Sequence, residues 1–280
     1  MYLNALIKTY VEKFILAGYK TPINEIRAMI SDTIDISLIN QITNSEIIIN
    51  EKEEKKLKKA LNRRIKKEPK ERILNKKIFR DVDLILNKNT FIPRSETELL
   101  IDIVIEKKIS PKYLLELGTG SGAISISLMK NFPQSRTVAT DINQKSLKLA
   151  KKNAKKNKVI DQINFICCNW LDIFVNIEFD LIVANPPYIR TGVINSLDPE
   201  VKKYDPHLAL DGGLDGLNAY KEILHALKPL LKPNTVIIFE IGFDQAKKVS
   251  KLMKEVNIMN IKVFKDYSNK DRFIMGSKKI

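Results

Sequence analysis

The tetrapeptide Asn185-Pro186-Pro187-Tyr188 combines residue types that could do chemistry on a nitrogen atom. Its two prolines lack backbone N–H groups and fix their φ angles, so the turn is stiff and poor in hydrogen-bond donors. The acceptors that remain are the Asn185 side-chain oxygen and the Pro186 carbonyl, which suit a planar –NH₂ group. Tyr188 adds an aromatic face that can stack on a flat group or contact a cation. The four residues could hold an amide or exocyclic amine with its lone pair aimed at an electrophile, or form an ordinary diproline turn.

The segment before this tetrapeptide predicts its place in the fold. Residues 179–184, Phe-Asp-Leu-Ile-Val-Ala, are a short apolar run rich in β-forming types, which is typical of a buried strand. The tetrapeptide therefore follows the carboxyl end of a strand, which is where open α/β sheets bind their ligands.

A second candidate site is the glycine-rich segment Glu-Leu-Gly-Thr-Gly-Ser-Gly, from Glu116 to Gly122. Its glycines let backbone approach a ligand closely, and a helix beginning near Gly122 would offer free N–H groups to a negatively charged or carboxylate-bearing ligand. The spacing is compatible with NAD, FAD or S-adenosylmethionine, although its order differs from the dinucleotide fingerprint. The absence of a P-loop lysine argues against a nucleoside triphosphate. The residues expected to contact the ligand are Gly118, Thr119, Gly120, Ser121 and Gly122.

Acidic and aromatic residues follow the next two predicted strands. Asp141 lies about 20 positions after the glycines, where a carboxylate can accept both hydroxyl hydrogens of a ribose; it could instead cap the helix expected near Gln144. Trp170, the only tryptophan, stands where an adenine ring would lie, or belongs to the core. Asp172 could bond an exocyclic amine or be a turn residue.

The chain from residue 112 onward alternates predicted strands and helices, which indicates an α/β fold with a parallel, doubly wound sheet. The predicted strands cover residues 113–117, 137–140, 163–168, 179–184, 236–241, 258–264 and 272–275. The predicted helices cover residues 123–130, 144–157, 217–231 and 244–256.

The first 75 residues have a different pattern, with apolar residues at helical spacing, which predicts a small helical domain at 1–75. Residues 76–94 alternate partly and contain turn-forming types, which favours a hairpin linker. We expect Ser95 to cap a helix running to Lys107. The third predicted domain, at 95–280, carries both glycine-rich and Asn-Pro-Pro-Tyr motifs.

The composition of the 280 residues gives a formal net charge of +15. This charge indicates either a polyanionic neighbour such as nucleic acid or a proteome biased toward lysine. Cys167 and Cys168 are adjacent in a predicted strand, so they point to opposite faces, and with only two histidines no metal site is expected. Because Lys8 and Glu12 interrupt the N-terminus, we expect no signal peptide or membrane span, and a cytoplasmic protein.

The motifs together resemble a class I S-adenosylmethionine-dependent methyltransferase acting on nitrogen. Three further segments resemble the HemK/PrmC family of release factor N5-glutamine methyltransferases. They are Phe91-Ile-Pro-Arg-Ser-Glu-Thr-Glu98, Leu208-Ala-Leu-Asp-Gly-Gly-Leu-Asp-Gly216 and Asp266-Tyr-Ser-Asn-Lys-Asp-Arg272. The resemblance covers nearly the whole chain and is specific from Phe91 onward. The chain departs from the family at Ser95, where a proline is usual, and near residues 72–75.

This resemblance implies a Rossmann-like, mostly parallel seven-stranded sheet with a small N-terminal helical domain that recognises the substrate, and a connecting β-hairpin. The implied substrate is the glutamine of the Gly-Gly-Gln motif in class I peptide chain release factors. The implied cofactor is S-adenosyl-L-methionine, which leaves as S-adenosyl-L-homocysteine. The implied catalytic residues are Asn185, Pro186 and Tyr188, and Asn185 is also expected at the cofactor.

The implied substrate contacts are the tetrapeptide, including Pro187, together with Phe91 and Arg94; alternatively Phe91 belongs to the core and Arg94 forms a surface ion pair. We expect a monomer that does not require direct nucleic-acid binding. Two other functions stay open: a methyltransferase for adenine N6 or guanine N2 in nucleic acid, and a basic RNA- or ribosome-associated protein without turnover.

Overall fold

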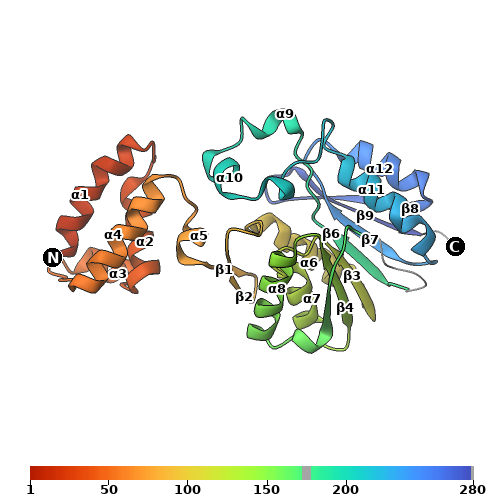
Figure 1. Cartoon of the computed structure of the whole chain (residues 1–280), viewed down its shortest axis with the longest axis horizontal. Helices are drawn as coiled ribbons and strands as arrows, with labels where there is room; N and C mark the ends of the chain where they lie inside the picture. The colour runs from red at the N-terminus through yellow and green to blue at the C-terminus, as the bar shows by residue number, and fades with distance from the viewer. Residues whose placement is uncertain (172–177, 279–280) are drawn as a thin grey trace. The chain divides into compact units, whose positions relative to one another are not determined.

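The computed structural model describes residues 1–171 and 178–278, which form two compact units. One unit contains Met1–Asn75 together with the short segment Pro199–Tyr204, and the other contains Lys76–Asp198 and Asp205–Ile280. Figure 1 labels their helices and strands. No helix among the described residues is long and apolar enough to cross a lipid bilayer.

The first unit, here called the helical unit, is built from short helices. They are α1 (Leu3–Leu16), α2 (Pro22–Ile34), α3 (Leu38–Thr43), α4 (Glu51–Ile65), α5 (Lys70–Leu74) and α10 (Pro199–Tyr204). One apolar stripe from each long helix meets in the core, where Leu6, Ile26 and Leu57 are fully buried. The charged start of α4 is stabilised by a capping box between Asn50 and Glu53.

The second unit, here called the sheet unit, begins with a hairpin of β1 (Lys76–Phe79) and β2 (Val82–Ile85), which are antiparallel. A side chain from a later helix binds the end of β2. The amide of Asn153 accepts a hydrogen bond from the Ile85 N–H and donates one to the Ile85 carbonyl. The hairpin predicted between the helical N-terminus and the sheet is therefore present, and it packs with the sheet unit.

Seven strands form the main sheet in the order β5-β4-β3-β6-β7-β9-β8. The strands are β3 (Tyr113–Leu117), β4 (Arg136–Asp141), β5 (Ile163–Cys167), β6 (Leu181–Ala184), β7 (Val236–Glu240), β8 (Ile258–Lys265) and β9 (Asp271–Lys278). The first five strands in this order are parallel, and β9 is antiparallel to both of its neighbours. The predicted mostly parallel, seven-stranded sheet is confirmed.

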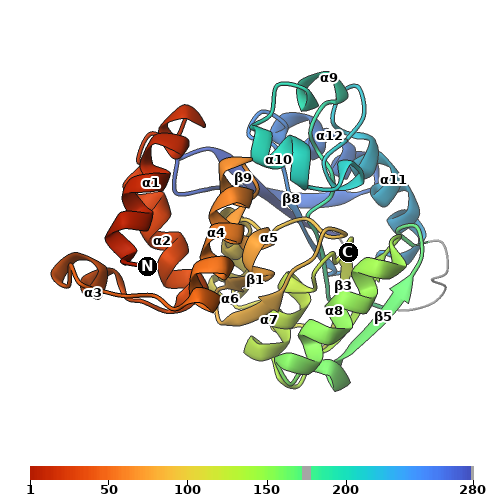
Figure 2. The same ribbon diagram turned by 60° about the vertical axis from the view of Figure 1, so that its left-hand side comes forward.

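Helices cover both faces of this sheet. The longer ones are α6 (Glu98–Glu106), α7 (Ala123–Asn131), α8 (Gln144–Lys156), α11 (Asn218–Leu227) and α12 (Ala246–Glu255). Short helical turns are η1 (Ser95–Thr97), η2 (Ile160–Gln162), α9 (Thr191–Ile194), η3 (His207–Ala209) and η4 (Lys228–Leu230). Figures 1 and 2 show α7 and α8 on one face and α11 and α12 on the other.

The central strands are apolar on both faces because each face carries its own core. Along β6, Leu181 and Val183 belong to the cluster that includes α6 and α7 residues, whereas Ile182 and Ala184 belong to the cluster that includes α11 and α12 residues. This alternation explains why the strand sequence is a continuous apolar run.

The start of α6 differs from the sequence prediction. Ser95 does not cap the helix: it lies inside the 3₁₀ turn η1, is exposed, and that turn has no side-chain cap hydrogen bond. The hydroxyl of Thr97, two residues later, instead donates to Glu240 of β7. A contact 143 residues away along the chain thus orients this turn, which local capping rules cannot anticipate.

Candidate active site

The sheet register brings three predicted motifs to one level. Leu117 of β3 pairs with Thr140 of β4 on one side and with Ala184 of β6 on the other. The glycine loop (residues 118–122), Asp141 and Asn185 come directly after these three positions. Because neighbouring strands are about 4.8 Å apart, the three motifs start within about 10 Å of one another. They lie at the carboxyl ends of three neighbouring strands, β4, β3 and β6. The strand order reverses between β3 and β6, which is where open α/β sheets bind ligands.

The glycine loop has a shape that other residues would disturb. Gly122 has a φ of +84°, and a Cβ placed on it would lie 3.0 Å from Ile126 Cδ1 and 3.2 Å from Ala150 Cβ. Gly118 and Gly120 also have positive φ angles. The backbone therefore has the left-handed conformation at these three glycines, and α7 begins directly after Gly122.

Glu116 fixes this loop from below. Its fully buried carboxylate accepts hydrogen bonds from Thr119 Oγ1 at 2.6 Å, from the Ser125 N–H at 3.1 Å, and from the Ser125 hydroxyl. Burial raises the pKa of Glu116 to about 7, against the opposing effect of these hydrogen bonds. One carboxylate thus ties the loop to the first turn of α7.

Asp141 closes the other side of the loop. Its Oδ2 accepts from the Gly120 N–H and its Oδ1 from the Asn143 N–H, both at 2.8 Å. Asp141 does not cap α8: Asn143 does, by accepting from the Lys145 N–H. Burial raises the pKa of Asp141, and the two backbone bonds oppose that rise. Each oxygen keeps a second lone pair, which suits a ribose diol.

Trp170 lies beside the same loop. A Cβ on Gly118 would be 3.6 Å from Trp170 Cζ3, and the indole N–H donates to Glu222 Oε2 at 2.8 Å. The half-buried ring also packs against the apolar cluster beneath α11 and α12. The ring therefore borders both the glycine loop and the core, and its packing against an adenine stays a prediction. Asp172 lies outside the described residues.

Asn185 is held by a side chain that the sequence did not bring to notice. Its Nδ2 donates to Thr97 Oγ1 at 3.3 Å, and the Thr97 hydroxyl donates to Glu240 Oε2 at 2.7 Å. Pro186 is buried and Pro187 is half-buried, as expected of a stiff corner packed at a strand end.

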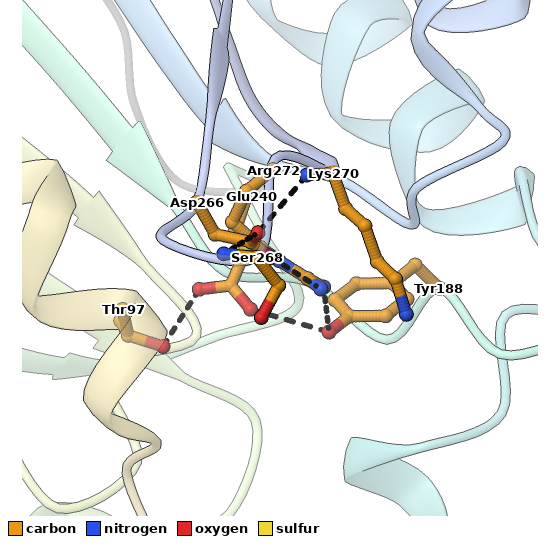
Figure 3. A network of polar contacts seen from close by, with 7 residues as sticks. All are labelled: Thr97, Tyr188, Glu240, Asp266, Ser268, Lys270 and Arg272. Carbon is orange, nitrogen blue, oxygen red and sulfur yellow. Dashed lines mark hydrogen bonds and ion pairs between the residues drawn. The ribbon is translucent and has the colours of Figure 1, made fainter.

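Tyr188 joins the same network, and Figure 3 draws its contacts with Glu240 and Arg272 together with Thr97. Its hydroxyl donates to Glu240 Oε1 at 3.2 Å and accepts from Arg272 Nη1 at 3.4 Å. Arg272 is itself held by Asp266, whose Oδ2 accepts from its Nε and Nη2. The hydroxyl end of Tyr188 is therefore anchored, and the position of the ring is fixed. Stacking of its face on a substrate stays a prediction.

Glu240 is the centre of this second network. Burial raises its pKa to about 7, and hydrogen bonds from Thr97 and Tyr188, with the charge of Arg272, work in the opposite direction. The clue in the sequence was an acid ending the apolar run Val-Ile-Ile-Phe-Glu. Thr97 gave no such clue, because threonine is common in the first turn of a helix.

Phe91 and Arg94, the other predicted substrate contacts, hold each other. The Arg94 guanidinium lies 4.8 Å from the centroid of the half-buried Phe91 ring, and its Nη2 is 2.5 Å from Asp205 Oδ2. The Asp205 side chain is fully buried, so this ion pair is not a simple surface contact. It ties the Phe91 segment to the end of the long connection that follows the tetrapeptide.

Comparison with known proteins gives consistent matches. Residues 95–202 match the family model "Methyltransferase small domain". The release factor glutamine methyltransferase of Agrobacterium fabrum is 36% identical over 264 residues, which cover 92% of this chain and 91% of that protein. The enzyme of the same name from Caulobacter vibrioides is 33% identical over 266 residues, covering 94% and 91%.

Longer relatives and solved structures agree with these matches. A bifunctional methyltransferase of Rickettsia bellii is 35% identical over 285 residues, which cover 92% of this chain and 51% of that protein. A methyltransferase structure from Pyrococcus furiosus matches with a TM-score of 0.51 at 17% identity, covering 71% of this chain and 90% of that one, and supports the fold alone. The sheet unit has the class I methyltransferase fold, and the chain belongs to the release factor glutamine methyltransferase family.

Proposed function

We propose that the protein transfers a methyl group from S-adenosyl-L-methionine to the side-chain amide nitrogen, N5, of a release factor glutamine. The glutamine is that of the Gly-Gly-Gln motif in class I peptide chain release factors. The names of the relatives support the substrate, and the donor-poor corner at Asn185 beside the glycine loop carries the chemistry. A reaction on release factors takes place in the cytoplasm.

The residues around the glycine loop fit the proposed cofactor. A Cβ on Gly120 would meet open space, so the loop leaves room for a ligand there, and Asp141 keeps acceptor capacity after its two backbone bonds. The glycine loop would hold the amino-acid part, Asp141 the ribose, and Trp170 the adenine. When bound, S-adenosyl-L-methionine supplies an activated methyl group on a sulfonium.

The corner at Asn185 addresses the chemical difficulty of the reaction. An amide nitrogen is a poor nucleophile, because its lone pair is delocalised into the carbonyl. The Asn185 side-chain oxygen and the Pro186 carbonyl would accept the two N–H hydrogens, orient the nitrogen and stabilise the positive charge that develops on it. The nitrogen then loses one proton to water or a nearby acceptor.

Recognition of the release factor is proposed for the helical unit. Its helix α3 exposes Leu38, Ile39 and Ile42, with exposed fractions between 52% and 72%, and apolar exposed residues suit a protein partner. We further propose that the chain acts as a monomer and that methyl transfer needs no direct contact with nucleic acid.

Methyl transfer from labelled cofactor to purified release factor tests the proposal. We expect label on the wild-type factor and none on a factor whose Gly-Gly-Gln is changed to Gly-Gly-Ala. Label on the altered factor would contradict the assigned glutamine.

A nucleic-acid amine is the second candidate, because the same corner could hold adenine N6 and the net charge is +15. RNA and DNA are therefore included as acceptors in the same assay. Label on nucleic acid, with none on the release factor, would favour this second candidate.

A further inference from the structure

The side-chain amide of Asn185 has two ends of similar size and opposite chemistry. Its oxygen accepts hydrogen bonds, whereas its –NH₂ group only donates. A substrate –NH₂ group needs the oxygen, so an Asn185 amide turned by 180° would present hydrogens to hydrogens. Something in the protein must choose between these two orientations.

The choice follows from counting hydrogens along the chain of contacts. Glu240, as a carboxylate, can only accept, and the Thr97 hydroxyl has a single hydrogen. Thr97 Oγ1 donates that hydrogen to Glu240 Oε2, which lies 2.7 Å from it. Only lone pairs of the Thr97 oxygen therefore remain for Asn185. The end of Asn185 that meets Thr97, at 3.3 Å, must therefore be the donor Nδ2.

The sheet holds Glu240 where this chain of contacts requires it. Phe239 of β7 pairs with Ala184 of β6. The next residues, Glu240 at the end of β7 and Asn185 just after β6, therefore lie side by side at the same level of the sheet. The hydroxyl of Tyr188 occupies the second carboxylate oxygen, Oε1, at 3.2 Å. Thr97 is 2% exposed and Glu240 is 2% exposed, so water does not compete for these contacts.

We propose that Thr97 and Glu240 are positioning residues that orient the Asn185 amide so that its oxygen faces the methyl acceptor. Neither residue touches the substrate in this proposal; both act through Asn185. The inference rests on the proposed function for its consequence on turnover. The orientation of Asn185 itself does not depend on the identity of the acceptor.

The same contacts predict a reversal when Glu240 takes up a proton. A protonated carboxyl can donate to Thr97 Oγ1, the Thr97 hydroxyl then donates to Asn185 Oδ1, and the amide –NH₂ turns toward the substrate. Burial, which raises the pKa of Glu240 to about 7, places this reversal near neutral pH.

Several charged or titratable groups face Glu240 from the elements around it. Thr97 and Tyr188 donate to its carboxylate, Arg272 of β9 stabilises the charged form, and Glu96 of η1 opposes it. Tyr220 of α11 donates to the backbone carbonyl of Glu240.

Substitution of Thr97 tests the role in turnover. In Thr97→Val the side-chain shape is kept but Asn185 loses its partner, so we expect kcat to fall about 10- to 100-fold, with unchanged cofactor affinity. Thr97→Ser keeps the hydroxyl and should recover most of the rate. Thr137→Val, at another buried threonine of the sheet unit, is the matched control. Equal rates for Thr97→Val and Thr137→Val would overturn the proposal.

The pH profile separates positioning from a merely structural role. In the wild type, kcat should fall as the pH is lowered through about 7, as Glu240 becomes protonated. Glutamine does not titrate, so Glu240→Gln should lose this acid limb, at a rate below the wild-type plateau. An acid limb that persists unchanged in Glu240→Gln would contradict the proposal.

The orientation can also be measured without any methyl acceptor. In ¹⁵N-labelled protein, the side-chain –NH₂ signals of Asn185 are assigned by their absence in Asn185→Asp. We expect Thr97→Val to shift them and speed their exchange with water, and Thr137→Val to leave them in place. Unmoved signals in Thr97→Val would refute the positioning role, whereas a failure to methylate release factor, with these shifts present, would refute only the proposed function.

Discussion

The carboxyl edge of the sheet has two halves, and each is built around one buried glutamate. In the half proposed to bind the cofactor, here called the cofactor half, Glu116 binds groups within nine residues along the chain, and the result is a shaped backbone loop. In the half proposed to hold the methyl acceptor, here called the acceptor half, Glu240 binds Thr97 and Tyr188, which lie 143 and 52 residues away, and the result is a set of oriented side chains. Burial raises the pKa of both glutamates to about 7. A buried glutamate thus fixes the backbone of a nearby loop in one half, and fixes side chains that are distant in sequence in the other.

The largest effect should come from the acceptor half. Asn185→Ala removes the acceptor that would hold the substrate –NH₂ group, so we expect kcat to fall on the order of 100- to 1,000-fold. Cofactor affinity, measured by calorimetry, should fall much less than kcat, because the glycine loop and Asp141 are intact even though Asn185 is also expected at the cofactor. Asn164→Ala, at an exposed residue of β5, is the control. Near-normal turnover in Asn185→Ala would contradict the proposal that the acceptor half holds the substrate –NH₂ group through Asn185.

The complementary change in the cofactor half is Asp141→Asn. It replaces a carboxylate that accepts from the Gly120 and Asn143 N–H groups with a neutral amide. We expect the dissociation constant of the cofactor to rise about 10-fold or more, since hydrogen bonds to a charged group contribute about 1.5–3 kcal/mol. At saturating cofactor, kcat should recover. The exposed Asp161→Asn serves as the comparison, and unaltered cofactor binding in Asp141→Asn would argue against a ribose contact.

A smaller effect, on stability, should follow from Gly122→Ala. The φ of +84° and the close approach of Ile126 make any side chain unfavourable here. We expect the free energy of unfolding to fall by about 1–3 kcal/mol, with weakened cofactor binding. Gly192→Ala provides a matched control, because a Cβ there meets open space and its φ is not left-handed. Equal stability of the two variants in urea would show that a side chain at position 122 causes no strain.

A further effect, confined to part of the pH range, is a change in how stability depends on pH. The pKa of Glu116 is about 7 in the folded protein and lies near its ordinary value when unfolded, so the folded state holds more protons between these values. The free energy of unfolding should therefore decrease as pH rises through this window, by at most about 1.4 kcal/mol per pH unit for each such group.

Replacing either glutamate should flatten this dependence by a similar amount. Urea unfolding at several pH values would compare Glu116→Gln and Glu240→Gln with Glu106→Gln, at an exposed residue of α6. If only one of Glu116→Gln and Glu240→Gln weakened the pH dependence of the free energy of unfolding, the inference that both glutamates have raised pKa values would be wrong.

The contrast between the halves also explains what the sequence could predict. The glycine loop and the tetrapeptide are contiguous motifs, so local patterns were sufficient to place each of them at the end of a strand, whereas the pairing of β3 with β6 came only from the structure. Ser95, in contrast, was wrongly expected to cap α6. The role of Thr97 was missed because its partner, Glu240, is distant in sequence.

The helical unit gives a second example of the same limit. Residues 199–204 follow the tetrapeptide in a stretch where no helix was predicted, yet they form α10 and pack with the N-terminal helices. Arg64 makes ion pairs with Glu25 at 3.1 Å and with Glu200 at 2.8 Å. The Tyr204 hydroxyl also donates to the Lys66 carbonyl. Contacts across more than 130 positions cannot be derived from periodicity, since it describes only neighbouring turns.

The proposed methyl transfer is best tested by fragment mass spectrometry of a release factor incubated with the protein and S-adenosyl-L-methionine. With the wild-type protein we expect one added methyl group on the glutamine side-chain nitrogen of the Gly-Gly-Gln motif. With Asn185→Ala we expect a strongly reduced amount, although that variant still binds the cofactor. A methyl group on any other atom of the factor, or an equal yield from both proteins, would contradict the proposed reaction and the role of Asn185 in it.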